Sequence, residues 1–254
     1  MLEAAKSTWI EVRDYLTEKT VVILPLGSTE PHGPHLPLDT DVTIAEAQAR
    51  RGAELLEQRG YQTMLLPSLS YGVTQWTDGF AGTVSLQPGT LWSILDDAIH
   101  SLAESGVRQV VFSNGHLESD HIDVLRGVIL DHTERGHDKA HAIFPDNTQR
   151  RWAATLGDEF SSGDCHAGRY ETSIMLQANA ESVRVDEQKV LQPIEVGLME
   201  KIQGGARNFV QCGATEAYCG DPASGTAEEG ADLVNRLADI LATSVAETWP
   251  ELVE

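Results

Sequence analysis

The pattern of hydrophobic and polar positions changes its period repeatedly along the chain up to Asp146. Short apolar runs rich in β-branched residues predict buried strands at 20–26, 61–67, 107–113 and 140–144. Between these runs the apolar positions recur with helical spacing, which predicts helices at 42–59, 90–105 and 120–135. Each helix is followed within a few residues by a glycine, which commonly ends a helix: Gly60, Gly106 and Gly136.

The succession of strand, helix and strand predicts an α/β fold with three layers, in which helices cover both faces of a mostly parallel central sheet. Beyond Asp146 the pattern is looser. We expect a helix near 168–178, a glycine-rich stretch from 204 to 230 and a long helix at about 226–249. Because no repeat, low-complexity tract or linker divides the sequence, we expect one domain spanning residues 1–254.

The composition narrows the range of partners. The chain has 18 Lys and Arg against 39 Asp and Glu, a formal net charge of −21, so it should repel phosphate backbones and anionic lipids. Nucleic acid and membranes are therefore not expected as partners. The sequence has neither a signal peptide nor an apolar run of the ~20 residues that span a bilayer, which predicts a cytoplasmic protein. Three cysteines at irregular spacing predict free thiols: Cys165, Cys212 and Cys219.

Two of the predicted strands run directly into unusual polar clusters. The strand at 20–26 is followed by the segment GSTEPHGPHLPLDTD, and the strand at 107–113 is followed by NGHLE. In open α/β sheets, ligands bind outside the carboxyl ends of the strands, where these clusters lie. Imidazole and carboxylate groups suit zinc, manganese and similar ions, and several carboxylates suit two metals that share a bridging residue. We therefore expect a two-metal site with the ligands Glu30, His32, Asp41, His116 and Glu118.

Other polar residues near these clusters have no role that the sequence settles. His35 and Asp39 either shape the loop or hold the ligands in place. His121 lies outside the motifs, so a helix or surface position is its default interpretation.

These motifs resemble those of the creatininase family, in which one strand leads into G-S/A-x-E-x-H-G-x-H with a following Asp, and a later strand leads into NGH. The similarity continues in the family's order through Ser7–Trp9, Tyr71–Gly72, Gly82–Leu86, Asp164–Ser173 and Gly220–Gly230. The resemblance implies that one metal is bound by Glu30, Asp41 and His116. It implies that the other is bound by His32, Asp41 and Glu118, with Asp41 bridging the two.

The resemblance also implies the chemistry and the cofactors. It points to two divalent ions per chain, Zn²⁺, Mn²⁺ or Fe²⁺, which polarise a carbonyl and lower the pKa of a shared water. His166 is then the acid/base that gives a proton to the leaving nitrogen. Glu171 ligates metal, orients His166 or binds substrate. By the same resemblance the chain is a homo-oligomer, a hexamer.

The substrate is less determined by the resemblance, because family members hydrolyse creatinine, formylated pyrimidine intermediates, a peptide in redox-cofactor maturation or a cyclic keto-inositol. We expect a small amide, formamide or cyclic amide, with a keto-inositol or creatinine as alternatives. Creatinine is not the expected preference, because creatininase has an aromatic residue in place of Leu117 and a Trp-Asp pair in place of Ser162 and Gly163. Trp76 and Asp78 predict a differently shaped, more acidic wall.

Two other functions stay open. Cys165 and His166 could form a thiol nucleophile and base, although neighbouring side chains usually point apart. Alternatively, the metals could be structural and the chain a metal-binding module. Structural zinc sites are normally closed by four Cys or His ligands, whereas this set is rich in carboxylates.

Overall fold

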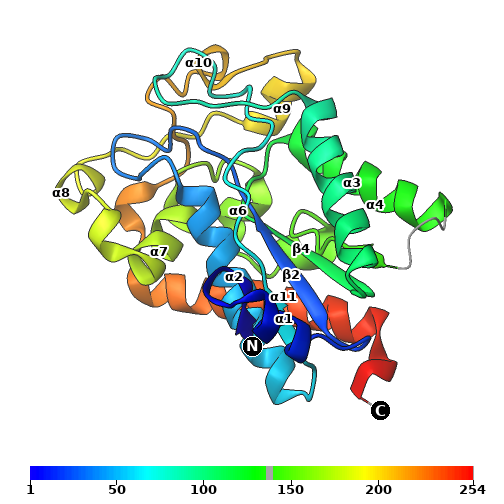
Figure 1. Cartoon of the computed structure of the whole chain (residues 1–254). Helices are drawn as coiled ribbons and strands as arrows, with labels where there is room; N and C mark the ends of the chain where they lie inside the picture. The colour runs from blue at the N-terminus through cyan, green and yellow to red at the C-terminus, as the bar shows by residue number, and fades with distance from the viewer. Residues whose placement is uncertain (136–139, 254) are drawn as a thin grey trace.

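Five parallel strands form a single sheet at the centre of the computed structural model, which describes residues 1–135 and 140–253 (Figure 1). The strand order is β1-β3-β2-β4-β5, and all four pairings are parallel. The expected α/β class with a parallel central sheet is therefore confirmed. The strands are β1 Leu2–Glu3, β2 Val21–Leu26, β3 Thr63–Leu65, β4 Gln109–Asn114 and β5 His141–Ile143.

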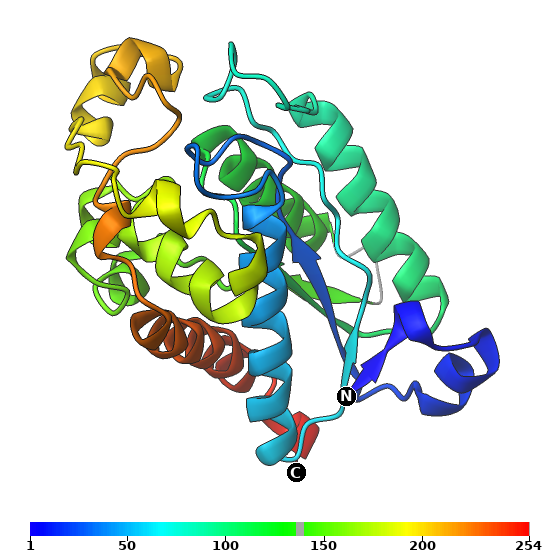
Figure 2. The same cartoon turned by 90° about the vertical axis from the view of Figure 1, so that its left-hand side faces the viewer.

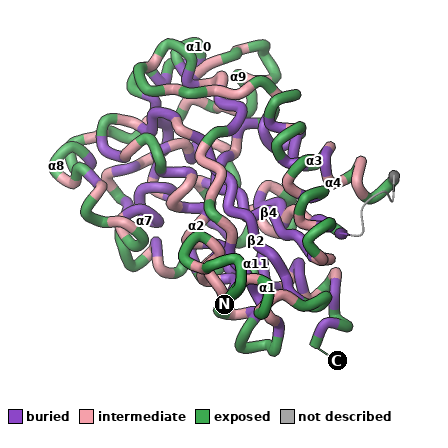
Figure 3. The backbone as a smooth tube through the Cα atoms, in the orientation of Figure 1, coloured by how far each residue is buried: buried purple, intermediate pink, exposed green. Residues whose placement is uncertain are grey.

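Helices cover both faces of the sheet, as Figure 2 shows. Alternate residues of a strand point to opposite faces, so Val22 and Leu24 pack with α3 and α4, whereas Val21 and Ile23 pack with α2 and α11. β2 and β4 are buried along their whole length (Figure 3). This burial on both faces explains why their sequences read as continuous apolar runs. The four helices are α2 Thr40–Gln58, α3 Pro88–Glu104, α4 Ser119–Arg135 and α11 Ala227–Thr248.

Shorter helices lie beyond this three-layer frame. Helix α7 packs against both α2 and α11, and α9 and α10 lie at the top of the molecule in Figure 1. None of the described helices is long and apolar enough to cross a membrane. The remaining α-helices are α1 Trp9–Tyr15, α5 Arg150–Ala153, α6 Asp158–Ser162, α7 Arg169–Ala178, α8 Val185–Gln188, α9 Leu198–Gln203 and α10 Phe209–Cys212. The 3-10 turns are Ala4–Lys6, Ala180–Ser182, Pro222–Ser224 and Pro250–Val253.

The four expected strands and five expected helices are all present, with ends that shift by about two residues or less. Gly60 and Gly106 follow α2 and α3 with φ of 92° and 94°, the left-handed conformation that ends many helices. Gly136, expected in the same role after α4, lies outside the described residues. The pattern did not predict β1 or α1, which are too short to show a period.

The sheet order places one crevice at the centre of the fold. From β2 the chain proceeds to β3 on one side, whereas β4 pairs with β2 on the other side and leads on to β5. Loops that leave β2 and β4 therefore diverge, and ligands bind in such a crevice at the carboxyl ends of the strands. The two polar clusters of the sequence lie at this point.

Candidate metal centre

The register of the sheet brings the two polar clusters together. Leu26, the last residue of β2, pairs with Asn114, the last residue of β4. The loop after β2 carries Glu30 and His32, and the loop after β4 carries His116. Because the two strands end side by side, the loops begin at the same edge of the sheet.

Helix α2 completes the site because its first turn approaches both strand ends. A Cβ atom on Gly115 would lie 2.1 Å from the carbonyl oxygen of Asp41, and one on Gly27 would lie 2.6 Å from the amide nitrogen of Val42. Only glycine therefore permits this approach. It places the Asp41 carboxylate between the two loops.

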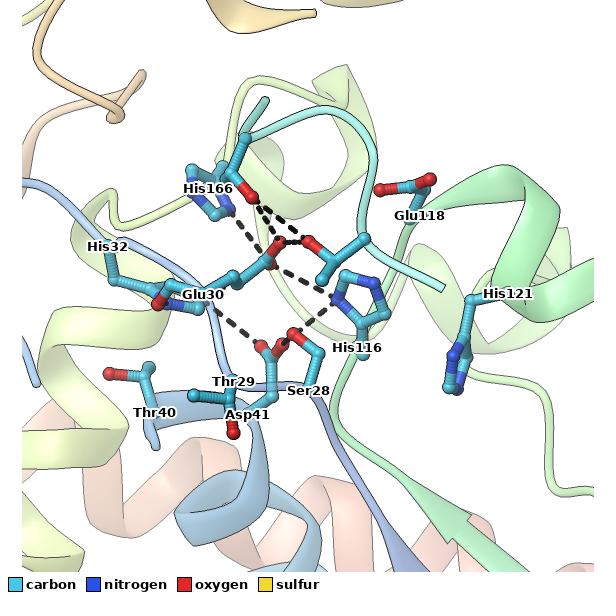
Figure 4. Close-up of polar contacts among 12 residues, drawn as sticks. Ser28, Thr29, Glu30, His32, Thr40, Asp41, His116, Glu118, His121 and His166 are labelled. Atoms are coloured by element: carbon cyan, nitrogen blue, oxygen red, sulfur yellow. Dashed lines mark hydrogen bonds and ion pairs between the residues drawn. The ribbon is translucent and has the colours of Figure 1, made fainter. Parts of the chain in front are cut away.

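A first group of three buried ligand atoms joins Glu30, Asp41 and His116, as Figure 4 shows. The Nδ1 atom of His116 lies 2.9 Å from Asp41 Oδ2 and 3.2 Å from Glu30 Oε1. All three side chains are almost fully buried. One imidazole and two carboxylates within ion-binding distance form a set that suits a divalent cation.

A second group joins His32, Asp41 and Glu171. The Nε2 atom of His32 lies 3.1 Å from Asp41 Oδ1 and 3.5 Å from Glu171 Oε2. Asp41 therefore presents Oδ1 to this group and Oδ2 to the group of His116. This is the geometry that a bridging carboxylate needs.

The histidine rings are oriented as metal ligands are. In each of three histidines, one ring nitrogen lies close to a backbone carbonyl oxygen. The distance is 3.0 Å for His32, 2.8 Å for His116 and 3.0 Å for His166. A carbonyl oxygen only accepts, so that ring nitrogen carries a proton, and the other nitrogen faces the carboxylates, where it would offer its lone pair to a metal ion once deprotonated. The carbonyl groups belong to Glu30, Val73 and Pro31.

The charges of the site also fit bound cations. The ion pairs that Glu30, Asp41 and Glu171 form within the described part of the chain are to histidines. Burial raises the pKa of Glu171 to about 8, with Asp41 adding to the rise and His32 opposing it. Burial disfavours the charged form of His32, but Asp41 and Glu171 outweigh it and raise its pKa to about 10. Three buried carboxylates thus share a proton or a cation, and divalent ions would supply the missing positive charge.

Glu118 lies outside both groups, contrary to the expected ligand set. Its Oε1 and Oε2 atoms accept hydrogen bonds from the backbone N–H groups of Gln75 and Trp76 at 3.0 and 3.1 Å. In Figure 4 it lies to one side of the contacts that join Glu30 and Asp41. Burial raises the pKa of Glu118 to about 7. The structure therefore brings Glu171, and not Glu118, next to His32 and Asp41.

A direct test separates these two glutamates. We expect Glu171→Gln to lower the metal content by about one ion per chain, because a neutral amide is a poor ligand for a hard cation. Glu118→Gln should keep the same metal content as the unchanged protein. Elemental analysis of both purified variants measures this, and loss of an ion from Glu118→Gln alone would return Glu118 to the ligand set.

His166 forms a third possible ligand group, with Glu30 and His32. Its Nδ1 atom is 3.9 Å from Glu30 Oε1, and its ring is 4.5 Å from the ring of His32. Burial and the positive charge of His32 lower the pKa of His166 to about 4. Glu171 accepts a hydrogen bond of 2.6 Å from the backbone N–H of Ala167, whose left-handed φ of 49° forms the turn between the two site residues.

Several residues of the site were not predicted from the sequence. His121 is buried in α4, where it packs edge-on against His116 at 4.8 Å. Its Nε2 atom donates to Asn114 Oδ1 at 3.0 Å and its Nδ1 atom accepts from the Val73 N–H at 3.3 Å. It thus fixes the loop whose carbonyl group orients His116. The signal in the sequence for this role of His121 was its position five residues after His116.

Two threonines and two loop residues complete the surroundings. The Thr74 hydroxyl donates to Glu30, and the Thr77 hydroxyl donates to the same carboxylate at 3.3 Å. His35 is buried, and its Nε2 atom lies 2.8 Å from the Thr172 hydroxyl of α7. Asp39 is exposed at the start of α2 and makes no capping hydrogen bond there.

A cavity of about 270 Å³ opens over the two ligand groups. Its floor contains Glu30, Asp41 and His116, together with His166 and Glu171. Its walls are mostly apolar and come from α5, α6, α9, α10 and the loop before α3. The wall residues include Trp76, Leu117, Ala153, Phe160, Leu198, Met199, Ile202 and Phe209.

Trp76 lines the cavity as expected, Asp78 is not among its lining residues, and Phe209 is an additional aromatic residue that was not expected. Trp76 and Phe209 contact each other edge-on at 5.9 Å, and the Phe209 ring stacks on His166 at 4.3 Å. The chain thus supplies aromatic walls from segments other than those at Leu117 and Gly163. Phe209 was missed because it lies in a glycine-rich stretch without periodicity.

The thiol alternative has no support in the geometry. Cys165 is buried at the cavity, and burial together with the nearby Glu171 raises the pKa of its thiol well above the usual value. A protonated thiol is a poor nucleophile. The three cysteines of the chain are free and buried.

Comparisons with known proteins point to one family. A family model described as creatininase, creatinine amidohydrolase, matches residues 5–245. The mycofactocin precursor peptide peptidase of Mycobacterium ulcerans is 32% identical over 233 residues, covering 90% of this chain and 86% of that protein. The creatinine amidohydrolase of Pseudomonas putida is 35% identical over 115 residues, covering 43% of this chain and 42% of that protein.

Solved structures agree on the fold. The structure of a Mn creatininase aligns with a TM-score of 0.74 at 21% identity, covering 98% of this chain and 99% of that one. A second structure, of creatinine amidohydrolase, aligns with a TM-score of 0.73 at 22% identity and covers 98% of each chain.

Proposed function

Because the chain belongs to the creatininase family and is a metal-dependent hydrolase of C–N bonds, we propose that it is a binuclear amidohydrolase. We propose that its substrate is a short, apolar peptide or a peptide-like amide. The observation that carries the proposal is the position of the cavity. Its floor holds the two ligand groups, and its walls are apolar and aromatic. An amide carbonyl at the floor therefore has apolar surface for its substituents directly above.

Each residue of the floor has a role in this proposal. Glu30, Asp41 and His116 hold one divalent ion, and His32, Asp41 and Glu171 hold the other. A bound pair of ions supplies a Lewis acid for the carbonyl and a water of lowered pKa. The structures of Mn and Zn–Zn forms among the similar creatininases support Mn²⁺ or Zn²⁺ as the ions.

His166 serves as the acid/base for the leaving nitrogen. Its Nε2 proton is engaged by the Pro31 carbonyl group, so its Nδ1 atom is the one that takes up and releases a proton at the site. Stacking on Phe209 holds the ring in place. Breaking an amide needs such a donor, because a nitrogen that leaves without a proton would depart as a strongly basic anion.

Two kinds of relative, four mycofactocin precursor peptide peptidases and one creatinine amidohydrolase, suggest different substrates, and the cavity walls favour a peptide. The four peptide peptidases resemble the chain over most of its length, whereas the creatinine amidohydrolase of Pseudomonas putida resembles it over less than half. Creatinine is the second candidate, because Trp76 and Phe209 offer aromatic surface to a flat ring. Its small size leaves the apolar walls near α9 without contact.

The substrate proposal predicts an order of reactivity. With Mn²⁺ or Zn²⁺ present, kcat/KM for short apolar peptides should exceed that for creatinine by about tenfold or more, since an additional buried apolar side chain contributes about 1.5–3 kcal/mol. The comparison includes formamides and lactams and a chelated sample as the control. Creatinine as the best substrate by a wide margin would contradict the prediction.

We also propose that the chain forms a homo-oligomer, a hexamer, on the basis of the family resemblance. Static light scattering tests this directly against the chain mass of 27.6 kDa. A hexamer has six times this mass, and a scattering mass equal to that of one chain would contradict the proposal.

A further inference from the structure

We propose that the outer half of the cavity is a binding subsite for a bulky, uncharged apolar group of the substrate, and that it rejects a free carboxylate. The proposal rests on the proposed function, because it places this group next to the amide bond that is cleaved. The subsite is the set of apolar side chains from α5, α6 and α9 that line the cavity away from its floor. These are Ala153, Phe160, Leu198, Met199 and Ile202.

The α9 side of the subsite exposes apolar surface. Leu198 and Ile202 are only partly buried, and Met199 is 53% exposed, although all three line the cavity. A group of exposed apolar side chains around a hollow marks a binding surface more often than a scattered single residue does. Met199 also fits against Gly163, where a Cβ atom would lie 3.0 Å from its Cγ atom.

The segment that carries these residues is held in place by a buried anchor. The Asp164 carboxylate accepts hydrogen bonds of 2.8, 2.9 and 2.7 Å from the backbone N–H groups of three consecutive residues, Val196, Gly197 and Leu198. Asp164 directly precedes the Cys165–His166 pair of the site. The apolar wall is therefore fixed relative to the acid/base His166, which favours a preformed subsite.

The second fixed point lies on the opposite rim. The backbone N–H of Phe209 donates to the Trp76 carbonyl oxygen at 2.9 Å, so α10 is joined to the loop that Glu118 holds. Phe209 thereby connects the apolar wall to His166, on which it stacks. Two aromatic rings and the α9 side chains face the same space.

The charges around the cavity decide which groups it accepts. In the described part of the chain no lysine or arginine lines the cavity, and Lys201 of α9 is not among its lining residues. Four carboxylates do line it, and one of them, Glu118, is in neither ligand group. A substrate carboxylate in the outer half would therefore lose part of its hydration without gaining a positive partner, which is unfavourable. An aromatic or branched aliphatic group meets no such cost.

Three kinds of hydroxamic acid test the subsite on the Mn²⁺-loaded protein by calorimetry. Acetohydroxamic acid chelates metal without reaching the walls, arylalkyl hydroxamic acids of increasing chain length add an apolar ring, and matched ω-carboxyalkyl hydroxamic acids add a charge. We expect the best arylalkyl compound to bind about tenfold to a hundredfold more tightly than acetohydroxamic acid. The carboxyalkyl compounds should bind no more tightly than acetohydroxamic acid.

The outcomes separate the subsite from the metal site. Equal affinity for acetohydroxamic and arylalkyl compounds would overturn the subsite while leaving the proposed function intact. Binding of none of the compounds by metal-loaded protein would overturn the proposed function itself.

A charge placed in the subsite provides the matched variant. Met199→Arg should improve binding of the carboxyalkyl compounds by about tenfold or more and weaken binding of the arylalkyl ones, since it supplies the missing positive partner. Val210→Arg is the control, because Val210 is an exposed apolar residue of α10 that does not line the cavity. A similar change of selectivity in both variants would show a general charge effect and overturn the subsite.

Discussion

Replacing Asp41 with asparagine should remove metal from both positions of the centre and lower kcat/KM by about a thousandfold or more. The two carboxylate oxygens face different histidines, Oδ1 toward His32 and Oδ2 toward His116. An amide keeps the size of the side chain but presents one oxygen and no negative charge. Elemental analysis and activity measured on the same preparation give the two results together.

The matched control for this variant is Asp39→Asn. Asp39 lies two residues before Asp41, is exposed and belongs to neither ligand group, so its variant should keep its metal and its activity. Circular dichroism shows whether both variants stay folded. A folded Asp41→Asn protein with unchanged metal content would mean that the site is wrongly placed.

His166→Ala should keep about two ions per chain and lose activity by about a hundredfold to ten-thousandfold, the range for removal of a general acid. The groups of Glu30, Asp41 and His116 and of His32, Asp41 and Glu171 are complete without the His166 ring, although His166 also forms a possible third group with Glu30 and His32. Amide substrates should suffer more than an aryl ester analogue, whose phenolate leaving group departs without protonation. Turnover of matched substrates by the metal-loaded variant measures this difference.

Metal analysis distinguishes this role from ligation. The Nδ1 atom of His166 also lies near Glu30 and His32, so a variant that loses one ion would identify His166 as a ligand. Phe209→Leu is a useful comparison, because it removes the ring that stacks on His166 while the imidazole stays. It should keep both ions and lose less activity than His166→Ala.

The regular elements were predictable because the periodicity of this chain is strong. β2 and β4 are buried on both faces and read as unbroken apolar runs, whereas α2 and α3 have glycines in the left-handed conformation directly after them. The short helices α9 and α10 span 6 and 4 residues, which is too few to show a period. Their positions depend on tertiary contacts such as the Asp164 anchor, and those contacts leave no local pattern.

The candidate site was predictable where strand ends carry it. Glu30, His32 and His116 lie within a few residues of β2 and β4, so the sheet alone brings them together. The positions of Glu118 and Glu171 were not predictable, because the backbone of the loop at Trp76 engages the Glu118 carboxylate. A hydrogen bond to a distant loop cannot be inferred from spacing.

The aromatic residues of the cavity walls were also only partly predictable from the sequence. Comparison of Leu117 and Gly163 with the family pattern indicated that aromatic residues are absent there, and Trp76 was expected in the wall, but the contribution of Phe209 was not predicted. Phe209 lies 43 positions after His166 in the sequence, and the path of the chain through α9 and α10 brings the Phe209 ring onto the His166 ring. A position-by-position comparison misses a residue that is supplied from another segment.

Anomalous diffraction from crystals of the Mn²⁺-loaded protein tests the central claim most directly. We predict two peaks about 3.5–4 Å apart, on either side of the Asp41 carboxylate. One peak should contact Glu30 and His116, and the other should contact His32 and Glu171. A single peak, or two peaks that lie away from Asp41, would contradict a binuclear centre at this position.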